Sequence, residues 1–367
     1  MAQILGRLWE FLSRRVDSFL LGVALTIAGV GLITLFSAAD QSLARVTSQV
    51  WSLGFALLLM WIVANIPPPT IARVAVPLYA LGIVLLAAVA LWGVSVNGSR
   101  RWLNLGFGRF QPSELMKVAL PLMLAWYFQK FEGRIGWKDF ALAAVLIAVP
   151  VYLIKRQPDL GTSLLIAVSG LYVLYFAGLS WKVIAGLAAA AGAAAPLIWP
   201  HLRDYQRERI LTFIDPTRDP LGAGYHSSQA SIALGSGGVV GKGWLNGTQT
   251  HLDFLPERHT DFIFAVFGEE FGLVGNAVLI VLYLLLIGRG LMITAGASTL
   301  FARLIAGATT LMFFTYAFVN MGMVSGILPV VGVPLPFVSY GGTALLTLFI
   351  AIGILMSVHR HRKLVQT

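Results

Sequence analysis

The sequence predicts an all-α membrane protein, a polytopic bundle of ten transmembrane helices with one long extracytoplasmic loop between the seventh and eighth helices. Hydrophobic residues make up 57% of the 367-residue chain and charged residues only 11%, with a mean hydropathy of +0.81. A water-soluble protein would carry about 25% charged residues. Apolar stretches of about 20 residues, enough to cross a hydrocarbon layer about 30 Å thick, recur along the whole chain. We expect a single integral membrane domain over residues 1–367.

Turn-forming residues separate the predicted spans. The first span follows a basic N-terminal stretch without a convincing cleavage site, which favours a retained signal anchor. Breaks fall at three consecutive prolines (67–69), at Asn97-Gly98-Ser99, at Gln157-Pro158-Asp159 and in the proline-rich segment 328–336. The predicted spans are residues 18–38, 47–65, 72–94, 113–129, 140–155, 160–178, 182–199, 261–288, 300–326 and 340–358.

An even number of spans places both termini on one side of the membrane. Thirteen Arg and Lys residues fall on that side and thirteen on the other, but six of the latter lie in the long loop. Without the loop, where the positive-inside rule applies only weakly, the tally is 13 against 7, so the termini are expected in the cytoplasm. The formal net charge of +10 then divides into +9 on the cytoplasmic side and +1 outside, which favours anionic lipid over nucleic acid as its partner.

The loop of residues 200–260 is the only sizeable extramembrane segment that the sequence predicts. Residues 205–213 could form a short helix in it, and the Asp-Pro pairs and glycines that follow favour turns. We expect this loop to lie on the outer membrane face as a partial lid.

Several kinds of site are excluded or weakly supported. The chain contains no cysteine, which excludes disulfides, thiolate nucleophiles and Cys-ligated metals. The segment GSGGVVGKG (235–243) lacks the spacing of a phosphate-binding loop, and the four histidines of the long loop lack zinc-ligand spacing on a helix.

Acidic residues near the membrane are the informative ones, because ionisable groups in hydrocarbon are costly and are normally kept for function. Glu114, Asp159 and Asp261 each fall at the outer end of a predicted helix, the fourth, sixth and eighth. Glu269 and Glu270 lie deeper in the eighth helix, and at least one of them is expected to make an interior polar contact. Three different helices therefore offer a carboxylate at one depth.

Basic residues accompany these acids. Lys117 follows Glu114 by three residues and shares its helical face, while Arg101 and Arg109 lie in the loop just before. Such a site suits an anionic, lipid-linked substrate, whose phosphates the cations would hold while a carboxylate acts as a base. The same residues also fit two simpler roles: Glu114 and Lys117 could form an intrahelical ion pair, and a proton-coupled transporter would likewise carry intramembrane acids.

Six segments resemble the SEDS family of bacterial cell-wall polymerases, in order along nearly the whole chain. The sequence PERHTD within segment 255–272 points to the elongation members of the family rather than to the division members. The segments are NGSRRWLNLG (97–106), RFQPSELMK (109–117), QPDLGTS (157–163), DPLGAGYH (219–226), LPERHTDFIFAVFGEEFG (255–272) and GVPLPFVSYGG (332–342).

The resemblance implies ten transmembrane helices in the bacterial inner membrane and a peptidoglycan glycosyltransferase that joins lipid II units into glycan strands. Matching the motifs places the family's essential aspartate at Asp261. The family's polar cavity residues fall on Arg101, Glu114, Lys117 and Asp159, and we expect these together with Arg109 and His259 to bind the substrate.

Inverting transfer from a pyrophosphate donor needs one base and several cations, since pyrophosphate leaves readily once its charge is compensated. Asp261 would be the general base, or it would bind a divalent cation (Mg or Mn) on the pyrophosphate. The sequence leaves both roles open, and no cofactor is certain.

The resemblance also implies partners: lipid II itself, a class B penicillin-binding protein that cross-links the new strands, and other proteins of the elongation complex. Two alternatives from other functional classes stay open, a lipid II flippase and a scaffold of that complex. Against the flippase, no acidic cluster comparable to the outer one is found at the inner ends of the helices.

Overall fold

The computed structural model is almost entirely helical. The structure describes residues 16–96, 99–104, 109–202, 204–215, 223–251 and 257–362, and of residues 96, 99, 109, 198, 205, 223, 250 and 251 it describes the backbone only. Ten of its helices coincide with the ten predicted spans. They are α2 (Ser18–Ala38), α3 (Leu43–Ala64), α5 (Ala75–Trp92), α6 (Pro112–Lys130), α7 (Trp137–Arg156), α8 (Leu160–Phe176), α9 (Trp181–Ala193), α14 (Ile263–Ala295), α15 (Leu300–Val324) and α16 (Gly342–Arg360).

The chain is a multi-pass membrane protein by the length and composition of these helices. Within the described residues, seven of them are long and apolar enough to cross a membrane, or eight if α9 and the bent helical segment after it form one span. Helix α8, with 17 residues, is shorter, and α6 carries Glu114 and Lys117 in its first turns. The count of ten spans therefore stays a prediction.

A small β-sheet precedes α6, in a region where only a turn was predicted. Strands β1 (Val94–Val96), β2 (Ser99–Asn104) and β3 (Arg109–Phe110) are antiparallel in the order β1-β2-β3. Ser95 pairs with Arg100 and Leu103 with Phe110. A short helix, α4 (Pro68–Arg73), begins at the second of the three prolines, whose fixed φ suits the first turn of a helix.

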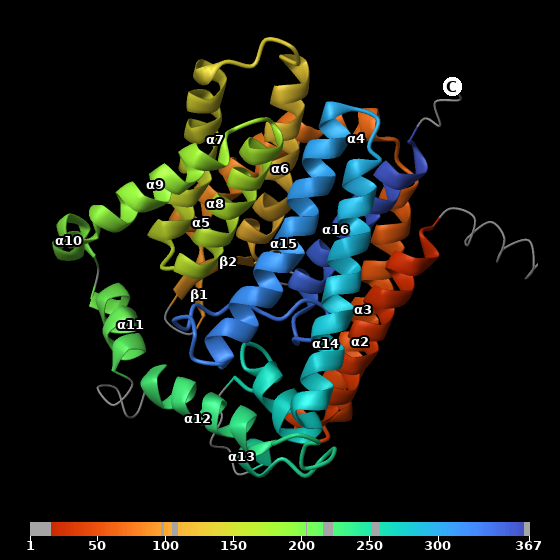
Figure 1. Cartoon of the computed structure of the whole chain (residues 1–367), viewed down its shortest axis with the longest axis vertical. Helices are drawn as coiled ribbons and strands as arrows, with labels where there is room; N and C mark the ends of the chain where they lie inside the picture. The colour runs from red at the N-terminus through yellow and green to blue at the C-terminus, as the bar shows by residue number, and fades with distance from the viewer. Residues whose placement is uncertain are drawn as a thin grey trace, which may run out of the picture.

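Helix α15 runs through the middle of the molecule (Figure 1) and is the most deeply buried of the candidate spans. It packs against α14 on one side and against α6 and α8 on the other, while α16 packs along α3. The end with α4, the α6–α7 turn and the last turn of α16 lies opposite the end with α12 and α13. Helix α15 thus separates α14 from α6 and α8 and contacts all three.

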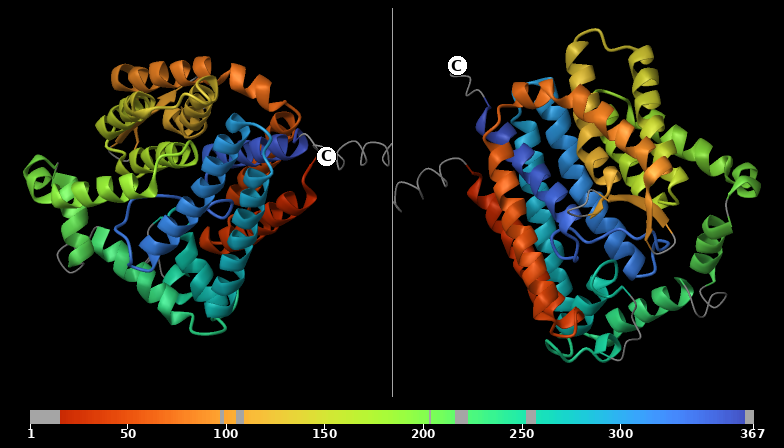
Figure 2. Two further views of the ribbon diagram at one scale, coloured as in Figure 1. Left: turned by 45° about the horizontal axis from the view of Figure 1, so that its top comes forward. Right: turned by 180° about the vertical axis from the view of Figure 1, so that it is seen from behind.

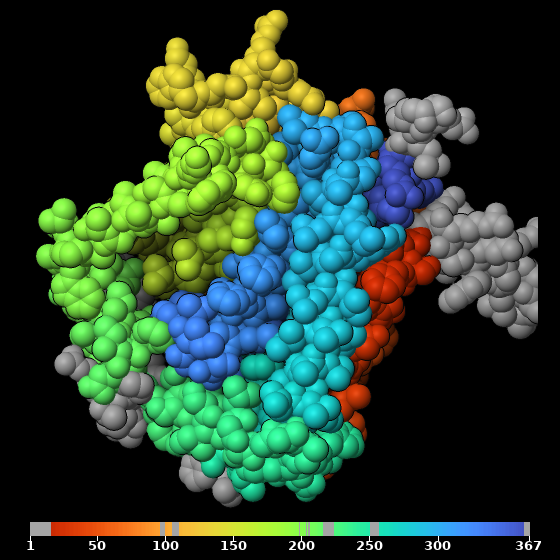
Figure 3. Space-filling model, viewed as in Figure 1, coloured from red at the N-terminus to blue at the C-terminus, as the bar shows by residue number. Residues whose placement is uncertain are grey.

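Four short α-helices connect α9 to α14 in an arc (Figure 2), in which α10 and α11 lie away from the bundle while α12 packs on α14. They are α10 (Ala195–Ile198), α11 (Asp204–Ile214), α12 (Ala223–Ser236) and α13 (Thr248–His251). Figure 3 shows the surface hollowed between α9 and α15, with α8 behind. Helix α11 confirms the helix predicted over residues 205–213. The turns predicted at the glycines after Leu221 are wrong for Gly224, because α12 packs on α14 through Ala230 and Ala233 and this burial outweighs the low helix propensity of glycine.

Candidate active site

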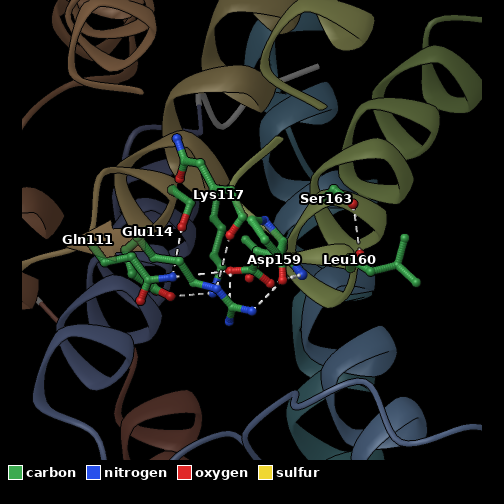
Figure 4. Close-up of polar contacts among 11 residues, drawn as sticks. Gln111, Glu114, Lys117, Asp159, Leu160 and Ser163 are labelled. Carbon is green, nitrogen blue, oxygen red and sulfur yellow. Dashed lines mark hydrogen bonds and ion pairs between the residues drawn. The ribbon is translucent and has the colours of Figure 1, made fainter. Parts of the chain in front are cut away.

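Four of the predicted site residues converge in one buried cluster (Figure 4). Glu114 and Lys117 come from the first two turns of α6, Asp159 from the residue before α8, and Arg101 from β2. Glu114, Lys117 and Asp159 are each less than 9% exposed, so these charges lie away from water. A buried charge is tolerated only where it is paired, and the cluster satisfies this requirement internally.

The pair on α6 is held from two sides. Pro112 opens the helix, which puts Glu114 in its first turn, where a carboxylate interacts favourably with the helix dipole. The Lys117 ammonium donates to Glu114 Oε1 at 2.6 Å and lies 5.2 Å from the ring centroid of Tyr316 on α15. Glu114 Oε2 is buried and has no hydrogen-bond partner among the described residues. The pair is thus more than a surface ion pair, because it joins α6 to α15 and leaves an acceptor unused.

Asp159 caps α8 and orients Arg101. Its Oδ1 accepts the Thr162 amide at 3.1 Å, and its Oδ2 lies 3.5 Å from the Arg101 guanidinium and 3.4 Å from Gln111 Nε2. The same guanidinium donates from Nε to the Gln157 carbonyl at 3.3 Å and from a second nitrogen to the Pro158 carbonyl. The unpredicted β-sheet therefore has a function: it carries Arg101 to the start of α8.

Asp261 precedes α14 and is half-buried. Burial raises the pKa of its carboxyl to about 6, with a further contribution from Glu257, while Arg209 and Arg101 act in the opposite direction. The charges of Arg101 and Asp159 reach this carboxyl. The structure thus brings Asp261 within electrostatic range of the cluster.

The backbone around Asp261 accepts hydrogen bonds from residues that were not predicted from the sequence. Three successive carbonyls, of residues 259, 260 and 261, each accept a hydrogen bond from the segment 320–340. The donors are Tyr340 N (2.9 Å), Ser339 Oγ (2.7 Å) and Asn320 Nδ2 (2.8 Å). Asn320 is fully buried in α15 and also donates to the Val333 carbonyl at 2.7 Å. Three such bonds in a row leave the aspartate little freedom to move.

The structure does not place His259 or Arg109 in the cluster. The His259 ring contacts Tyr340, with ring centroids 5.9 Å apart. Burial and the charge of Arg45 lower the pKa of His259. None of the charges that act on this ring belongs to the cluster around Lys117. The side chain of Arg109 lies outside the described residues, and its backbone pairs with Asn104.

An apolar pocket with a free volume of about 40 Å³ begins at the Glu114–Lys117 pair and is partly open to its surroundings. Residues of α6, α15 and α16 line it, with side chains such as Ile305, Met312 and Leu348. Its lining is almost wholly apolar except at the end that Lys117 forms. A hydrocarbon chain with an anionic group at one end matches this distribution of polarity.

A metal ion would have to rely on the substrate as well as on the protein. The described part of the chain holds no group of three or more His, Cys, Asp and Glu residues that could bind a metal. Magnesium is often held by one or two carboxylates together with substrate phosphates, and Asp261 fits that arrangement. Both roles predicted for Asp261 remain compatible with its surroundings.

Some of the missed residues carried a signal in the sequence. Asn320 is a polar residue inside an otherwise apolar predicted span, which is costly unless its hydrogen bonds are satisfied. Gln111, Ser339 and Tyr340 lie within segments on which the family resemblance rests. Tyr316 carried no signal, because an aromatic residue in an apolar helix is unremarkable.

Comparison with known proteins supports the resemblance. The FtsW/RodA/SpoVE model, described as a cell cycle protein, matches residues 16–364. The chain is 49% identical over 350 residues to the peptidoglycan glycosyltransferase MrdB of Escherichia coli, covering 95% of each chain. It is 32% identical over 372 residues to the probable peptidoglycan glycosyltransferase FtsW of Thiomicrospira cyclica, covering 98% of this chain and 95% of that protein.

Two solved structures share the fold. One is a chain from work on the structural coordination of polymerization and crosslinking by a peptidoglycan synthase complex, with a TM-score of 0.83 and 34% identity, covering 95% of this chain and 99% of that one. The other is the crystal structure of the rod shape determining protein RodA of Thermus thermophilus, with a TM-score of 0.72 and 31% identity, covering 95% and 97%. The similarity thus extends over nearly the full length of both structures.

Proposed function

Because the chain belongs to the FtsW/RodA/SpoVE family, we propose that it is a peptidoglycan glycosyltransferase that polymerises lipid II into glycan strands during lateral cell-wall elongation. The single observation that carries the proposal is the position of the charged cluster. Arg101 and Asp159 form an ion pair whose charges reach the half-buried Asp261, and Lys117 lines an apolar pocket inside the bundle. A lipid-linked pyrophosphate needs both a cationic site and an apolar one.

The division of roles follows from the chemistry of inverting transfer. The acceptor hydroxyl attacks the anomeric carbon of the donor, its proton passes to a base, and the bond to undecaprenyl pyrophosphate breaks with the electron pair going to the leaving oxygen. The leaving group needs charge compensation rather than a second acid, which Arg101 and Lys117 can supply. Glu114 and Asp159 hold these cations in place rather than performing the chemistry.

Asp261 is the proposed general base. A carboxyl with a pKa of about 6 is largely ionised at neutral pH and accepts a proton more readily than an ordinary aspartate. The alternative role, binding a magnesium or manganese ion on the pyrophosphate, uses the same carboxylate. Both require an ionised Asp261, and the metal dependence of activity separates them.

The apolar pocket is the proposed site of a polyprenyl chain. Such a chain would extend from Lys117 between α6, α15 and α16, with its pyrophosphate at the charged end. Arg109 and His259 are proposed to contact the head group of the substrate.

The proposed setting is the bacterial inner membrane, with ten spans, cytoplasmic termini and the active site on the outer face. The segment 200–260 partly covers this site as a lid. A class B penicillin-binding protein is the proposed partner, because polymerised strands must be cross-linked, and the similar chain of known structure comes from a peptidoglycan synthase complex. Other elongation-complex proteins and membrane lipids complete the proposed surroundings.

Polymerisation of lipid II by the purified protein in detergent, alone and with the partner transpeptidase, tests this function. The unsubstituted chain should lengthen glycan strands, and Asp261→Asn should abolish polymerisation while the protein stays monodisperse. Translocation of a labelled lipid II in proteoliposomes without any polymer would instead support the flippase. Inactivity in both assays, with the transpeptidase still bound, would support the scaffold.

A further inference from the structure

The glycine-rich segment 237–243 is inserted into a break in α14. In a continuous helix, the amides of residues 273 and 274 would donate to the carbonyls four residues earlier, those of 269 and 270. Here the inserted segment accepts hydrogen bonds from those two amides and donates hydrogen bonds to those two carbonyls. They run from Leu273 N to Gly238 O (2.9 Å), from Val274 N to Val239 O (3.0 Å), from Lys242 N to Glu269 O (3.0 Å) and from Gly243 N to Glu270 O (3.0 Å).

Glycine is required where the two segments meet. Gly272 adopts φ 64° and ψ −162°, a conformation outside the helical region that is essentially restricted to glycine, and this interrupts α14. A Cβ on Gly237 or Gly241 would lie 2.1 Å from a backbone oxygen of α14, Gly268 O and Glu270 O respectively. The segment GSGGVVGKG thus has a structural role, the close approach of two backbones.

A buried ion pair fastens the insertion. Glu269 is fully buried. Its Oε1 accepts hydrogen bonds from Lys242 Nζ at 2.7 Å, from the backbone N–H of Gln249 at 3.0 Å and from the Thr248 hydroxyl at 3.2 Å. All three donors lie between α12 and the end of α13. A carboxylate in the interior of a membrane helix is costly unless it is paired, so the ion pair with Lys242 stabilises Glu269 there.

The same segment is tied to α2 on its other side. Glu270 Oε1 accepts from the Ser37 hydroxyl and from the Leu245 amide, the latter at 3.2 Å. The indole of Trp244 donates to the Ile33 carbonyl at 3.2 Å. The insertion is therefore fixed between α2 and α14 and does not hang free in the long loop.

The break separates a short outer part of α14, residues 263–271, from the rest of the helix. Asp261 lies immediately before this outer part. Because the helix is not continuous at Gly272, the inserted segment sets the direction in which the outer part points. We propose that Lys242 and Glu269 are positioning residues for glycan transfer, which fix the outer part of α14 and through it Asp261.

This inference rests on the proposed role of Asp261, and kinetics on lipid II test it. Lys242→Met removes the ammonium and leaves Glu269 buried without its counterion. Its kcat should fall about tenfold to a hundredfold with KM for lipid II unchanged, because the pair does not touch the substrate and a misplacement of about 1 Å has an effect of this size. Lys242→Arg should retain most of the activity. Lys138→Met, an exposed lysine on α7, is the matched control and should leave kcat unchanged.

A structural readout accompanies the kinetics. The chain has no cysteine, so Val239→Cys with Val274→Cys introduces one reactive pair at residues whose backbones are bonded across the insertion. Cross-linking with a short bifunctional reagent should be efficient in an otherwise unsubstituted chain and reduced when Lys242→Met is added.

The double variant Lys242→Met with Glu269→Gln keeps the test decisive if the single variant does not insert. Without an uncompensated buried charge it should be monodisperse, yet its kcat should stay below that of the unsubstituted chain. Full kcat in either variant, or a raised KM with kcat unchanged, would overturn the inference. A failure of the proposed function is distinct, since the unsubstituted protein would then make no polymer at all.

Discussion

Asn320 lies one helical turn beyond Tyr316 on α15, so one face of this buried helix contacts both halves of the candidate site. The ring of Tyr316 lies beside the Lys117 ammonium, and the amide of Asn320 donates to the Asp261 carbonyl. Lys117, the cation expected to bind phosphate, and Asp261, the aspartate expected to act as base, therefore both contact the same helix. Catalysis that depends on their separation should be sensitive to α15, although α15 itself supplies neither group.

Asn320→Ala should lower kcat for glycan transfer about tenfold or more. The substitution leaves the carbonyls of Asp261 and Val333 without their donor, at a cost of about 1–3 kcal/mol for each buried group, and it frees the backbone next to the reacting carboxylate. Steady-state kinetics on lipid II measure the effect. Asn65→Ala, which alters an asparagine at the far end of α3, serves as the control. Unchanged kcat in a folded Asn320→Ala protein would contradict the positioning role.

The sequence predicted the positions of the helices well because a membrane span is a local property of about 20 consecutive residues. The sheet was missed because its strands, of 3, 6 and 2 residues, are much shorter than such a window. The Asn-Gly at 97–98 between alternating residues was nevertheless a hairpin signal. The break at Gly272 was not predicted, because the span of residues 261–288 is apolar on average although Glu269 and Glu270 lie just before the break.

The site was predictable in part for the same reason. Glu114 and Lys117 lie three residues apart on one helix, so their pairing could be anticipated. Acidic residues at the ends of apolar stretches can likewise be located from the sequence alone. The hydrogen bonds to the backbone of residues 259–261 join segments 59 or more residues apart, because their donors are Asn320, Ser339 and Tyr340. Single-sequence reasoning has no access to such contacts, and it could not show that the His259 ring lies beside Tyr340.

Arg101→Lys should impair polymerisation almost as strongly as Arg101→Ala. The guanidinium of Arg101 contacts three acceptors at once, the carbonyls of Gln157 and Pro158 and the Asp159 carboxylate, and a single ammonium cannot reproduce that fork. The measurement is the rate of polymer formation at saturating and at limiting lipid II.

The neighbouring residue supplies the control for this prediction. The side chain of Arg100 is exposed and makes a long hydrogen bond, 3.5 Å, to the Ala90 carbonyl, so Arg100→Lys should leave the rate unchanged. Equal activity of the Arg101→Lys and unsubstituted proteins would show that charge alone matters at this position.

Polymerisation should fall as the pH drops below about 6. Both proposed roles of Asp261 need its ionised form, and because burial raises its pKa to about 6, the carboxyl becomes protonated below that pH rather than near pH 4. The profile of kcat/KM should therefore rise with a midpoint near pH 6 and level off above it. Repeating the series with magnesium, with manganese and with chelator separates a base from a metal ligand. An acidic limb with its midpoint near pH 4 would contradict the environment described for Asp261.

Asp17→Asn should lower the apparent Tm by a few degrees at neutral pH. The Asp17 carboxylate caps α2 by accepting the Leu20 amide at 3.0 Å and holds Arg289 of α14 through bonds of 2.7 and 2.9 Å. Burial alone would raise the pKa of Asp17, but the hydrogen bonds from Arg289 and Leu20 outweigh it, and the pKa lies below the usual value. A carboxyl whose pKa is depressed on folding stabilises the protein above its unfolded pKa.

The pH dependence of this effect has a definite sign. The stabilisation should be complete at neutral pH and be lost as the pH falls through the lowered pKa of Asp17, so the Tm difference between the two proteins should shrink only below about pH 4. Asp17→Ala divides the two contributions, because asparagine can still cap α2 but carries no charge to pair with Arg289, whereas alanine can do neither, so the Tm of Asp17→Ala should be the lowest of the three. Thermal unfolding in detergent, followed across this pH range, measures all three. A Tm for Asp17→Asn equal to that of the unsubstituted chain would show that the cap alone matters and that the ion pair between α2 and α14 adds nothing.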